Sequence, residues 1–280
     1  MIILRMFGVS CSSVGLALLI LLVICSISEI ARYRVKFILY MLASTFFATW
    51  TIPLMLFRIH DWRNALIPAW QLKWFAKLLG CNYIIRGHNN IIKDSGAIVL
   101  INHQSSLDVI VLAELWPILE HCTVIAKKQV LWLGSYGLAT WLWGTIFIDK
   151  KKGSSAQDTL NSTAEIIKKR KAKVLMFPEG TRHSNNSLLP FKKGAFHLAI
   201  ETQMPLQPIV VSKYYYIDHD KKKFDSGTNY ITILPPIPTS GLKKEDIPAL
   251  IDKAYEVMNE EFQKSTQEAI KKYSGQVKVN

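Results

Sequence analysis

The stretch AIVLINHQSSLD, residues 97–108, decides how this chain folds. Its first five residues are apolar and mostly branched, a pattern that predicts a short buried β-strand. The five residues that follow Asp108, VIVLA, are also apolar, and we expect a helix there. The polar residues between these two elements, His103 among them, are therefore expected in a loop at the end of a buried strand.

The same loop holds a histidine and a carboxylate that can act together. Ser105 is a natural N-cap, and Asp108 would take the N3 position of the expected helix, from which its carboxylate reaches back to the loop. A neutral imidazole oriented by a carboxylate can remove a proton from a hydroxyl whose oxygen attacks an electrophile. The His-x4-Asp spacing therefore predicts His103 as a general base and Asp108 as its orienting partner. An ordinary capping box is the alternative.

Further along the chain, short apolar runs alternate with helical patterns. We expect strands near residues 83–87, 124–126, 145–148, 174–177, 206–214 and 230–234, and helices at 155–171 and from Pro248 to about residue 272. This alternation is typical of an α/β domain with a largely parallel sheet flanked by helices. We assign this domain to residues 59–280.

Two uncharged apolar stretches, residues 7–28 and 37–57, precede this domain. Each is long enough, as a helix, to cross a hydrocarbon core about 30 Å thick. Residues 1–58 are therefore expected to be a membrane anchor made of a pair of hydrophobic helices. Two alternatives stay open: both helices could dip into one leaflet, or the first stretch could be a cleavable signal peptide.

The charge balance indicates which partners to expect. Lys and Arg number 34 and Asp and Glu 21, a net charge of +13, which favours anionic lipid headgroups or a phosphorylated ligand. Residues 58–77 mix tryptophans with Lys and Arg, which suits a membrane interface or a helix packed on the core. No nucleic-acid-binding motif is evident, and the four cysteines have no ligand-like spacing, so neither nucleic acid nor a metal is expected.

A second functional stretch, FPEGTR at residues 177–182, follows another expected strand. Gly180 permits a tight turn and close backbone approach to a ligand, and the planar guanidinium of Arg182 suits a phosphate monoester. A surface turn with an ion pair between Glu179 and Arg182 is the alternative. Lys193 then precedes an expected helix, where positive charge and backbone donors favour anions, unless that lysine is only solvated.

Four segments, taken together, resemble the motifs of a known enzyme family. They are NHQSSLD at 102–108, GTIFIDK at 144–150, FPEGTR at 177–182 and LQPIV at 206–210. In order and spacing they resemble the four motifs of the 1-acylglycerol-3-phosphate O-acyltransferases. The flanking segments IAKK at 125–128 and LPFKKGAFHLA at 189–199 are similar to the animal endoplasmic-reticulum members. The resemblance covers essentially the whole chain.

The resemblance implies transfer of an acyl group from acyl-CoA to the sn-2 hydroxyl of lysophosphatidic acid, giving phosphatidic acid. Acyl-CoA would be a co-substrate and no cofactor would be needed. The predicted site comprises the catalytic residues His103 and Asp108 and the substrate-binding residues Lys150, Glu179, Gly180, Thr181, Arg182 and Lys193. The family also implies a protein of the endoplasmic reticulum membrane, in contact with membrane lipids, whose catalytic domain faces the cytosol.

Three positions depart from the family pattern. Lys150 stands where arginine is usual, which keeps the charge but loses the bidentate fork. His183 replaces a small polar residue, and Gln129 stands where glutamate is common. These departures put the fine substrate contacts in doubt, so a different lysophospholipid or glycerol 3-phosphate is an alternative acceptor. A non-catalytic membrane protein that binds lipid is the alternative from another class.

A third uncharged stretch, residues 130–148, is also long enough to cross a membrane. If His103 and Arg182 act on one substrate, however, this stretch cannot cross the bilayer between them. Its three glycines and three tryptophans also favour an amphipathic or re-entrant patch that ends in a strand at residues 145–148. We therefore expect it to lie on or in the near leaflet, where it can help to shape a path for an acyl chain.

Overall fold

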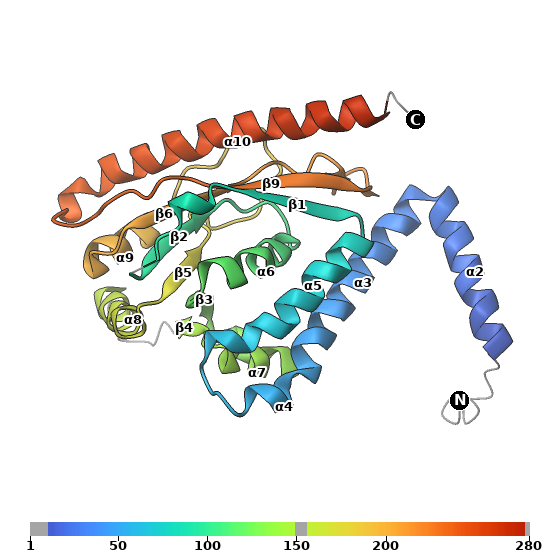
Figure 1. Ribbon diagram of the computed structural model, residues 1–280, viewed down its shortest axis with the longest axis horizontal. Helices are drawn as coiled ribbons and strands as arrows, with labels where there is room; N and C mark the ends of the chain where they lie inside the picture. Colours follow the sequence, from blue (N-terminus) through green and yellow to red (C-terminus); the bar gives the residue numbers. More distant parts are fainter. Residues whose placement is uncertain (1–10, 94, 149–155, 278–280) are drawn as a thin grey trace.

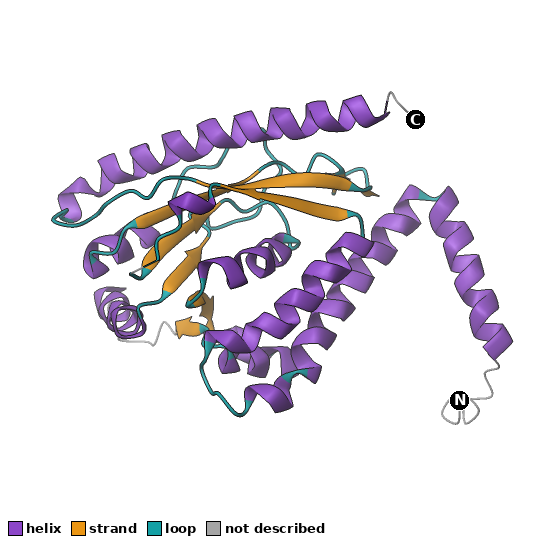
Figure 2. Ribbon diagram, in the orientation of Figure 1, coloured by secondary structure: helices purple, strands orange, loops and turns teal. Residues whose placement is uncertain are grey.

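A seven-stranded sheet lies between two layers of helices (Figures 1 and 2) in the computed structural model, which describes residues 11–93, 95–148 and 156–277. The strand order is β1-β9-β6-β2-β5-β3-β4, and every neighbouring pair is parallel except β6 with β9. The strands are β1 (Cys81–Arg86), β2 (Ala97–Ile101), β3 (Cys122–Lys127), β4 (Ile146–Ile148), β5 (Lys173–Met176), β6 (Leu206–Val211) and β9 (Gly227–Ile233). The predicted α/β domain with a largely parallel sheet is confirmed.

Nine α-helices are described in the same ranges of the chain. They are α2 (Cys11–Ile27), α3 (Glu29–Trp50), α4 (Ile52–Met55), α5 (Leu66–Leu78), α6 (Asp108–Leu119), α7 (Ser135–Leu142), α8 (Ala156–Arg170), α9 (Gly194–Thr202) and α10 (Ile247–Val277). A small antiparallel hairpin, β7 (Ile217–Asp218) with β8 (Lys223–Phe224), was not anticipated from the sequence.

Strand β2 lies at the centre of the sheet, and all five of its side chains are buried. Successive side chains of β2 point to opposite faces of the sheet and belong to two different hydrophobic clusters. Val99 and Ile101 pack with the side chains of α5 and α6, whereas Ile98 and Leu100 pack with those of α8, α9 and α10. Burial on both faces explains the uninterrupted apolar run in the sequence.

The two functional loops emerge at the same edge of this sheet. His103 follows the carboxyl end of β2, and Glu179 follows the carboxyl end of β5. Because β2 and β5 are parallel neighbours, the loops that leave their carboxyl ends lie side by side. In open α/β sheets, ligands bind at this edge.

The expected pair of membrane-spanning helices is not confirmed. Among the residues that the structure describes, no helix combines the length and the apolar character needed to cross a bilayer. Helix α3 begins at Glu29, so the basic residues Arg32, Arg34 and Lys36, which lie between the two apolar stretches in sequence, fall inside this helix. The first four residues of the expected stretch 7–28 lie outside the described ranges.

The third apolar stretch folds as three short elements, and the strand predicted at its end is confirmed. They are the 3-10 helix η3 (Lys128–Trp132), the eight-residue helix α7 and strand β4. Gly134 and Gly144, with φ angles of +60° and +92°, separate these elements, because this backbone conformation suits glycine. Helix α7 packs against α3 and α4.

Candidate active site

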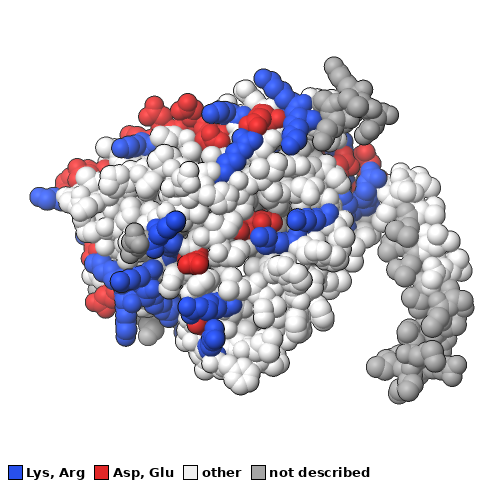
Figure 3. Space-filling model, in the orientation of Figure 1, with Lys and Arg blue, Asp and Glu red and all other residues white. Residues whose placement is uncertain are grey.

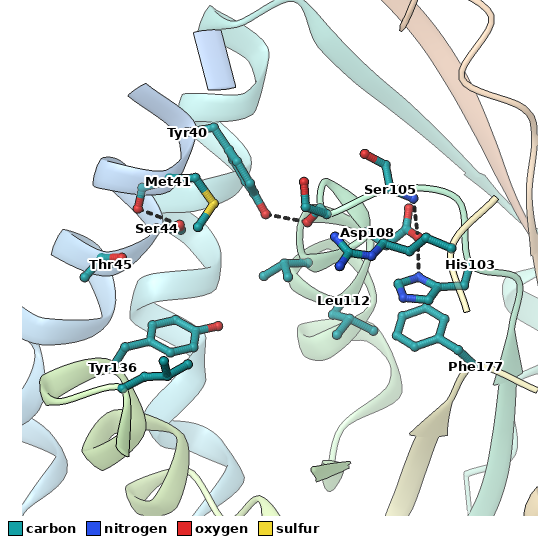
Figure 4. A pocket seen from close by; sticks show the side chains of 14 residues that line it. Tyr40, Met41, Ser44, Thr45, His103, Ser105, Asp108, Leu112, Tyr136 and Phe177 are labelled. Carbon is teal, nitrogen blue, oxygen red and sulfur yellow. Dashed lines mark hydrogen bonds and ion pairs between the residues drawn. The ribbon is translucent and has the colours of Figure 1, made fainter. Parts of the chain in front are cut away.

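His103 and Asp108 form a close pair at the end of β2. The imidazole Nδ1 lies 2.7 Å from Oδ2 of Asp108, and Figure 4 shows this contact. The same oxygen accepts hydrogen bonds from the backbone N–H groups of Gln104 at 2.7 Å and Ser105 at 3.0 Å. Asp108 is buried, so these donors and the imidazole, rather than bulk water, satisfy this carboxylate oxygen.

The position of Asp108 in its helix differs from the prediction. Helix α6 begins at Asp108, with Leu107 as the N-cap, so the acid is the first helical residue and not the third. The hydroxyl of Ser105 makes only a long contact, 3.4 Å, with the N–H of Leu107. The carboxylate therefore organises this loop, and the serine hydroxyl contributes little to it.

Phe177 supports the imidazole from the neighbouring loop. Its ring stacks on that of His103, with centroids 4.0 Å apart and an interplanar angle of 20°. In Figure 4 the two rings lie one above the other. The sequence analysis gave Phe177 no role, although its place between a buried strand and the PEGTR segment was a usable signal.

Glu179 joins the two loops. Its Oε1 accepts a hydrogen bond of 2.8 Å from the backbone N–H of His103, and its Oε2 accepts one of 2.8 Å from Leu189. The side chain of His183 also pairs with Oε2 through Nε2. Glu179 is buried and does not pair with Arg182, which contradicts the alternative of a surface ion pair. Both oxygens of the Glu179 carboxylate are therefore hydrogen-bonded within the protein.

The residues around Glu179 present the exposed part of the site. Gly180 has a φ of +66°, and Lys192 lies so close that an added Cβ would meet its side chain at 2.6–2.8 Å. Thr181 and Arg182 are exposed, as is Lys193, which occupies the N-cap position of α9 without a capping hydrogen bond from its side chain. Lys150 lies outside the described residues.

His103, Asp108 and Arg182 line one cavity of about 510 Å³. Tyr40 on α3 and Tyr136 on α7 line the same cavity, as Figure 4 shows. His103, the predicted base, and Arg182, the residue predicted to bind a phosphate, are far apart in sequence but line the same cavity.

A second cavity, of about 570 Å³, continues from the first between α5, α6 and α7. Leu112, Leu133, Tyr136 and Arg182 line both cavities, and the far part of the second is lined largely by apolar side chains such as Trp116. The space can accept a hydrocarbon chain whose polar end lies at His103 and Arg182. Val130, Leu133 and Trp143 of the stretch 130–148 contribute to this lining. That the stretch shapes a path for an acyl chain stays a prediction.

A polar recess of about 350 Å³ lies on another side of Arg182, lined by Gln104, Ser105, His183 and His219 among others. His219, in the loop of the β7–β8 hairpin, was missed in the sequence. Its Nδ1 is 2.9 Å from the hydroxyl of Tyr33. Burial, and then the charge of Lys222, lower the pKa of His219 below its ordinary value. Arg182 therefore stands between an apolar cavity and a polar recess.

The fold and this site define an acyltransferase. The chain matches the family model described as "Acyltransferase" over residues 68–212. It is 40% identical to 1-acyl-sn-glycerol-3-phosphate acyltransferase alpha of Ovis aries, over 81% of this chain and 78% of that protein. It is 37% identical to the beta enzyme of Homo sapiens, over 88% and 89% of the two chains. The chain therefore belongs to the 1-acyl-sn-glycerol-3-phosphate acyltransferase family.

A solved structure supports the fold. The crystal structure of the 1-acyl-sn-glycerophosphate acyltransferase PlsC from Thermotoga maritima superposes with a TM-score of 0.62. The match covers 83% of this chain and 97% of that chain, with 21% sequence identity. The architecture of the sheet and its helices is thus shared.

Proposed function

We propose that this acyltransferase moves the acyl group of acyl-CoA to the sn-2 hydroxyl of lysophosphatidic acid, giving phosphatidic acid and CoA. The single observation that carries the proposal is that His103, its partner Asp108 and the cation Arg182 line one cavity. An apolar space continues from that cavity. A base, a cation and an apolar path match a substrate with a hydroxyl, a phosphate and an acyl chain.

In this reaction His103 acts directly as a general base. Its Nδ1–H donates to Asp108, which leaves Nε2 to accept the hydroxyl proton while the substrate oxygen attacks the thioester carbonyl. The tetrahedral intermediate collapses with cleavage of the carbon–sulfur bond, and the imidazolium returns its proton to the CoA thiolate. Base catalysis of this type contributes roughly a hundred- to ten-thousand-fold in rate. No acyl-enzyme and no cofactor is required.

Arg182 binds the phosphate of the acceptor. Arg182 is exposed, lines the cavity and, within the described part of the chain, makes no ion pair. It can therefore offer its donors to a phosphate monoester. Gly180 and Thr181 bring the backbone close to the same ligand, whereas Lys193 and Lys150 are proposed to contact substrate phosphates.

Glu179 has a different role from the substrate contact that the sequence predicted. Its carboxylate accepts bonds from the backbone of His103 and of Leu189 and pairs with His183. We assign it the positioning of the two functional loops relative to each other.

Exposed apolar side chains support contact with membrane lipids. On α3 and α5 they include Leu42, Phe46, Trp70 and Trp74, and Trp132 on η3 is 83% exposed. Figure 3 shows a largely uncharged surface around α4 and the lower part of α3, whereas charged side chains lie over α5 and gather over α10 and α8. Tryptophans of this kind favour the headgroup region of a bilayer. We place the protein at the endoplasmic reticulum membrane, with the catalytic domain facing the cytosol.

The test is CoA release by the detergent-purified full chain with an acyl-CoA and a panel of acceptors. The panel holds lysophosphatidic acid, lysophosphatidylcholine and glycerol 3-phosphate, and His103→Ala is the control. The fastest initial rate is expected with lysophosphatidic acid. A faster rate with another acceptor would reassign the substrate, and absence of CoA release with every acceptor would overturn the enzymatic proposal.

A further inference from the structure

Asp108 has a hydrogen-bond partner that lies outside the loop of His103. The hydroxyl of Tyr214, a residue beyond the end of β6, donates to Oδ1 of Asp108 at 2.9 Å. Tyr214 is 5% exposed. We propose that Tyr214 is a positioning residue: it holds the Asp108 carboxylate in one orientation and, through it, aims the imidazole of His103. This inference rests on the function proposed above.

The two oxygens of Asp108 have unequal environments. Oδ2 faces three donors: Nδ1 of His103 and the backbone N–H groups of Gln104 and Ser105. Oδ1 has Tyr214 as its hydrogen-bond partner within the described ranges. The terminal torsion of an aspartate is broad and roughly two-fold, so the carboxylate by itself can turn. The Tyr214 hydroxyl opposes that rotation and keeps Oδ2 directed toward the imidazole.

Tyr214 is itself held firmly. Its backbone N–H donates to Oε1 of Gln104 at 3.2 Å, and Nε2 of Gln104 donates to the carbonyl of Val211 at 3.1 Å. Asn102 also pairs with Val211, donating to its carbonyl at 2.9 Å and accepting from its N–H at 2.7 Å. The segment after β6 and the loop of His103 are therefore joined at several points, and the Tyr214 hydroxyl reaches Asp108 from a rigid support.

The protonation state of Tyr214 agrees with a donor role. Burial, together with the neighbouring Tyr83 and Asp108, raises the pKa of Tyr214 well above its ordinary value, so the phenol keeps its proton. The hydroxyl of Tyr83 lies 3.4 Å away and can donate to that of Tyr214. The order of donation is then Tyr83 to Tyr214 to Asp108, which leaves the carboxylate as the acceptor of the series.

The chain offers a matched control two residues away. Tyr216 is 2% exposed, and its hydroxyl donates to Oδ1 of Asn229 at 2.8 Å. Tyr214→Phe and Tyr216→Phe each remove one buried hydroxyl and leave one carbonyl or carboxylate oxygen without its donor. We expect both to lower the melting temperature, but only Tyr214→Phe to disturb Asp108 and His103.

The experiment compares kcat, KM and pH profile of the detergent-purified full chain and the two variants. For Tyr214→Phe we expect kcat to fall about tenfold or more, while KM for lysophosphatidic acid changes less than twofold, since Arg182 is untouched. The pH at half-maximal kcat/KM should rise, because a carboxylate with one donor fewer stabilises the imidazolium more strongly. The other ionisable groups near His103 and Asp108, which include Glu179, Arg182, His183, His219, Tyr40 and Tyr83, are the same in all three proteins.

A second readout does not depend on turnover. Proton NMR can detect the hydrogen-bonded proton between His103 Nδ1 and Asp108. The resonance is assigned to this proton by its absence from the spectrum of His103→Ala. The resonance should shift or broaden in Tyr214→Phe and persist in Tyr216→Phe. If kcat and this resonance are unchanged in Tyr214→Phe, or if both variants lose activity equally, the positioning role is overturned. A wild-type protein without turnover whose resonance still depends on Tyr214 would instead refute the proposed reaction and support the positioning role.

Discussion

Two carboxylate–imidazole pairs lie on the adjacent loops of this site, and they differ in what the imidazole can reach. Asp108 pairs with His103, and Glu179 pairs with His183. Both carboxylates are buried and both also accept backbone N–H groups. The side chain of His103 is 21% exposed and lines the cavity, whereas that of His183 is 9% exposed.

The ring nitrogens explain the difference in role. Nε2 of His183 is taken by Glu179, and its Nδ1 accepts a hydrogen bond of 3.2 Å from the N–H of Asn185. Nε2 of His103 has no hydrogen bond to the described residues, so it can serve a substrate. A histidine paired with a carboxylate can therefore act as a base only where one of its ring nitrogens is free to face the cavity. Where both nitrogens are hydrogen-bonded within the protein, as in His183, the histidine has a structural role.

The largest expected effect separates the two histidines by activity. His103→Ala should lower kcat by roughly a hundred- to ten-thousand-fold, because the general base is lost. Asp108 keeps two backbone donors, so the fold should survive. His183→Ala is the matched variant, and CoA release is the measurement. Turnover retained by His103→Ala, or lost equally in both variants, would remove the distinction.

A substitution of Arg182 tests whether this cation, which follows the Glu179–His183 pair in the loop, binds the substrate phosphate. Arg182→Ala should raise KM for lysophosphatidic acid about ten- to a hundredfold, because a hydrogen bond to a charged group is worth about 1.5–3 kcal/mol. Initial rates over a range of acceptor concentrations give this value. Lys213→Ala, which removes an amine paired with Asn186, is a control for the loss of one positive charge. An unchanged KM in Arg182→Ala would mean that the phosphate binds elsewhere.

The bracing role of His183 predicts a loss of stability. His183→Ala leaves Oε2 of the buried Glu179 with the N–H of Leu189 as its remaining hydrogen-bond donor among the described residues. We expect the free energy of unfolding to fall by about 1–3 kcal/mol, the range for a buried polar group that loses a partner. Denaturant unfolding followed by tryptophan fluorescence measures the change. A variant as stable as the wild type would show that Glu179 holds the loops without His183.

The smallest expected effect concerns Ser105. A helix N-cap that loses its hydroxyl usually costs about 1 kcal/mol. Here the hydroxyl makes contacts of 3.4 Å, whereas Asp108 accepts the backbone N–H of Ser105 at 3.0 Å. Ser105→Ala should therefore change the free energy of unfolding by less than about 0.5 kcal/mol. A loss near 1 kcal/mol would restore the serine as a true cap.

Local patterns predicted the parts of the fold that depend on neighbours in sequence. The run 97–101 is uniformly apolar because β2 is covered on both faces, and the expected strand has the same bounds as the observed one. The strand predicted at 206–214 instead ends at Val211, because the segment beyond it turns away to bind the His103 loop. The expected membrane-spanning pair is not confirmed among the described residues, and α3 includes charged residues in its first turns.

The sequence by itself determined the alternation of strands and helices, the pairing of His103 with Asp108 and the candidacy of Arg182. These follow from hydrophobic period, short spacing and residue chemistry, all of which act over a few residues. Only the tertiary structure decided that His103 and Arg182 line one cavity, that Glu179 pairs with His183, and that Tyr214 reaches Asp108. The physical reason is that parallel strands bring distant loops to one edge, where contacts depend on sheet order and not on distance along the chain.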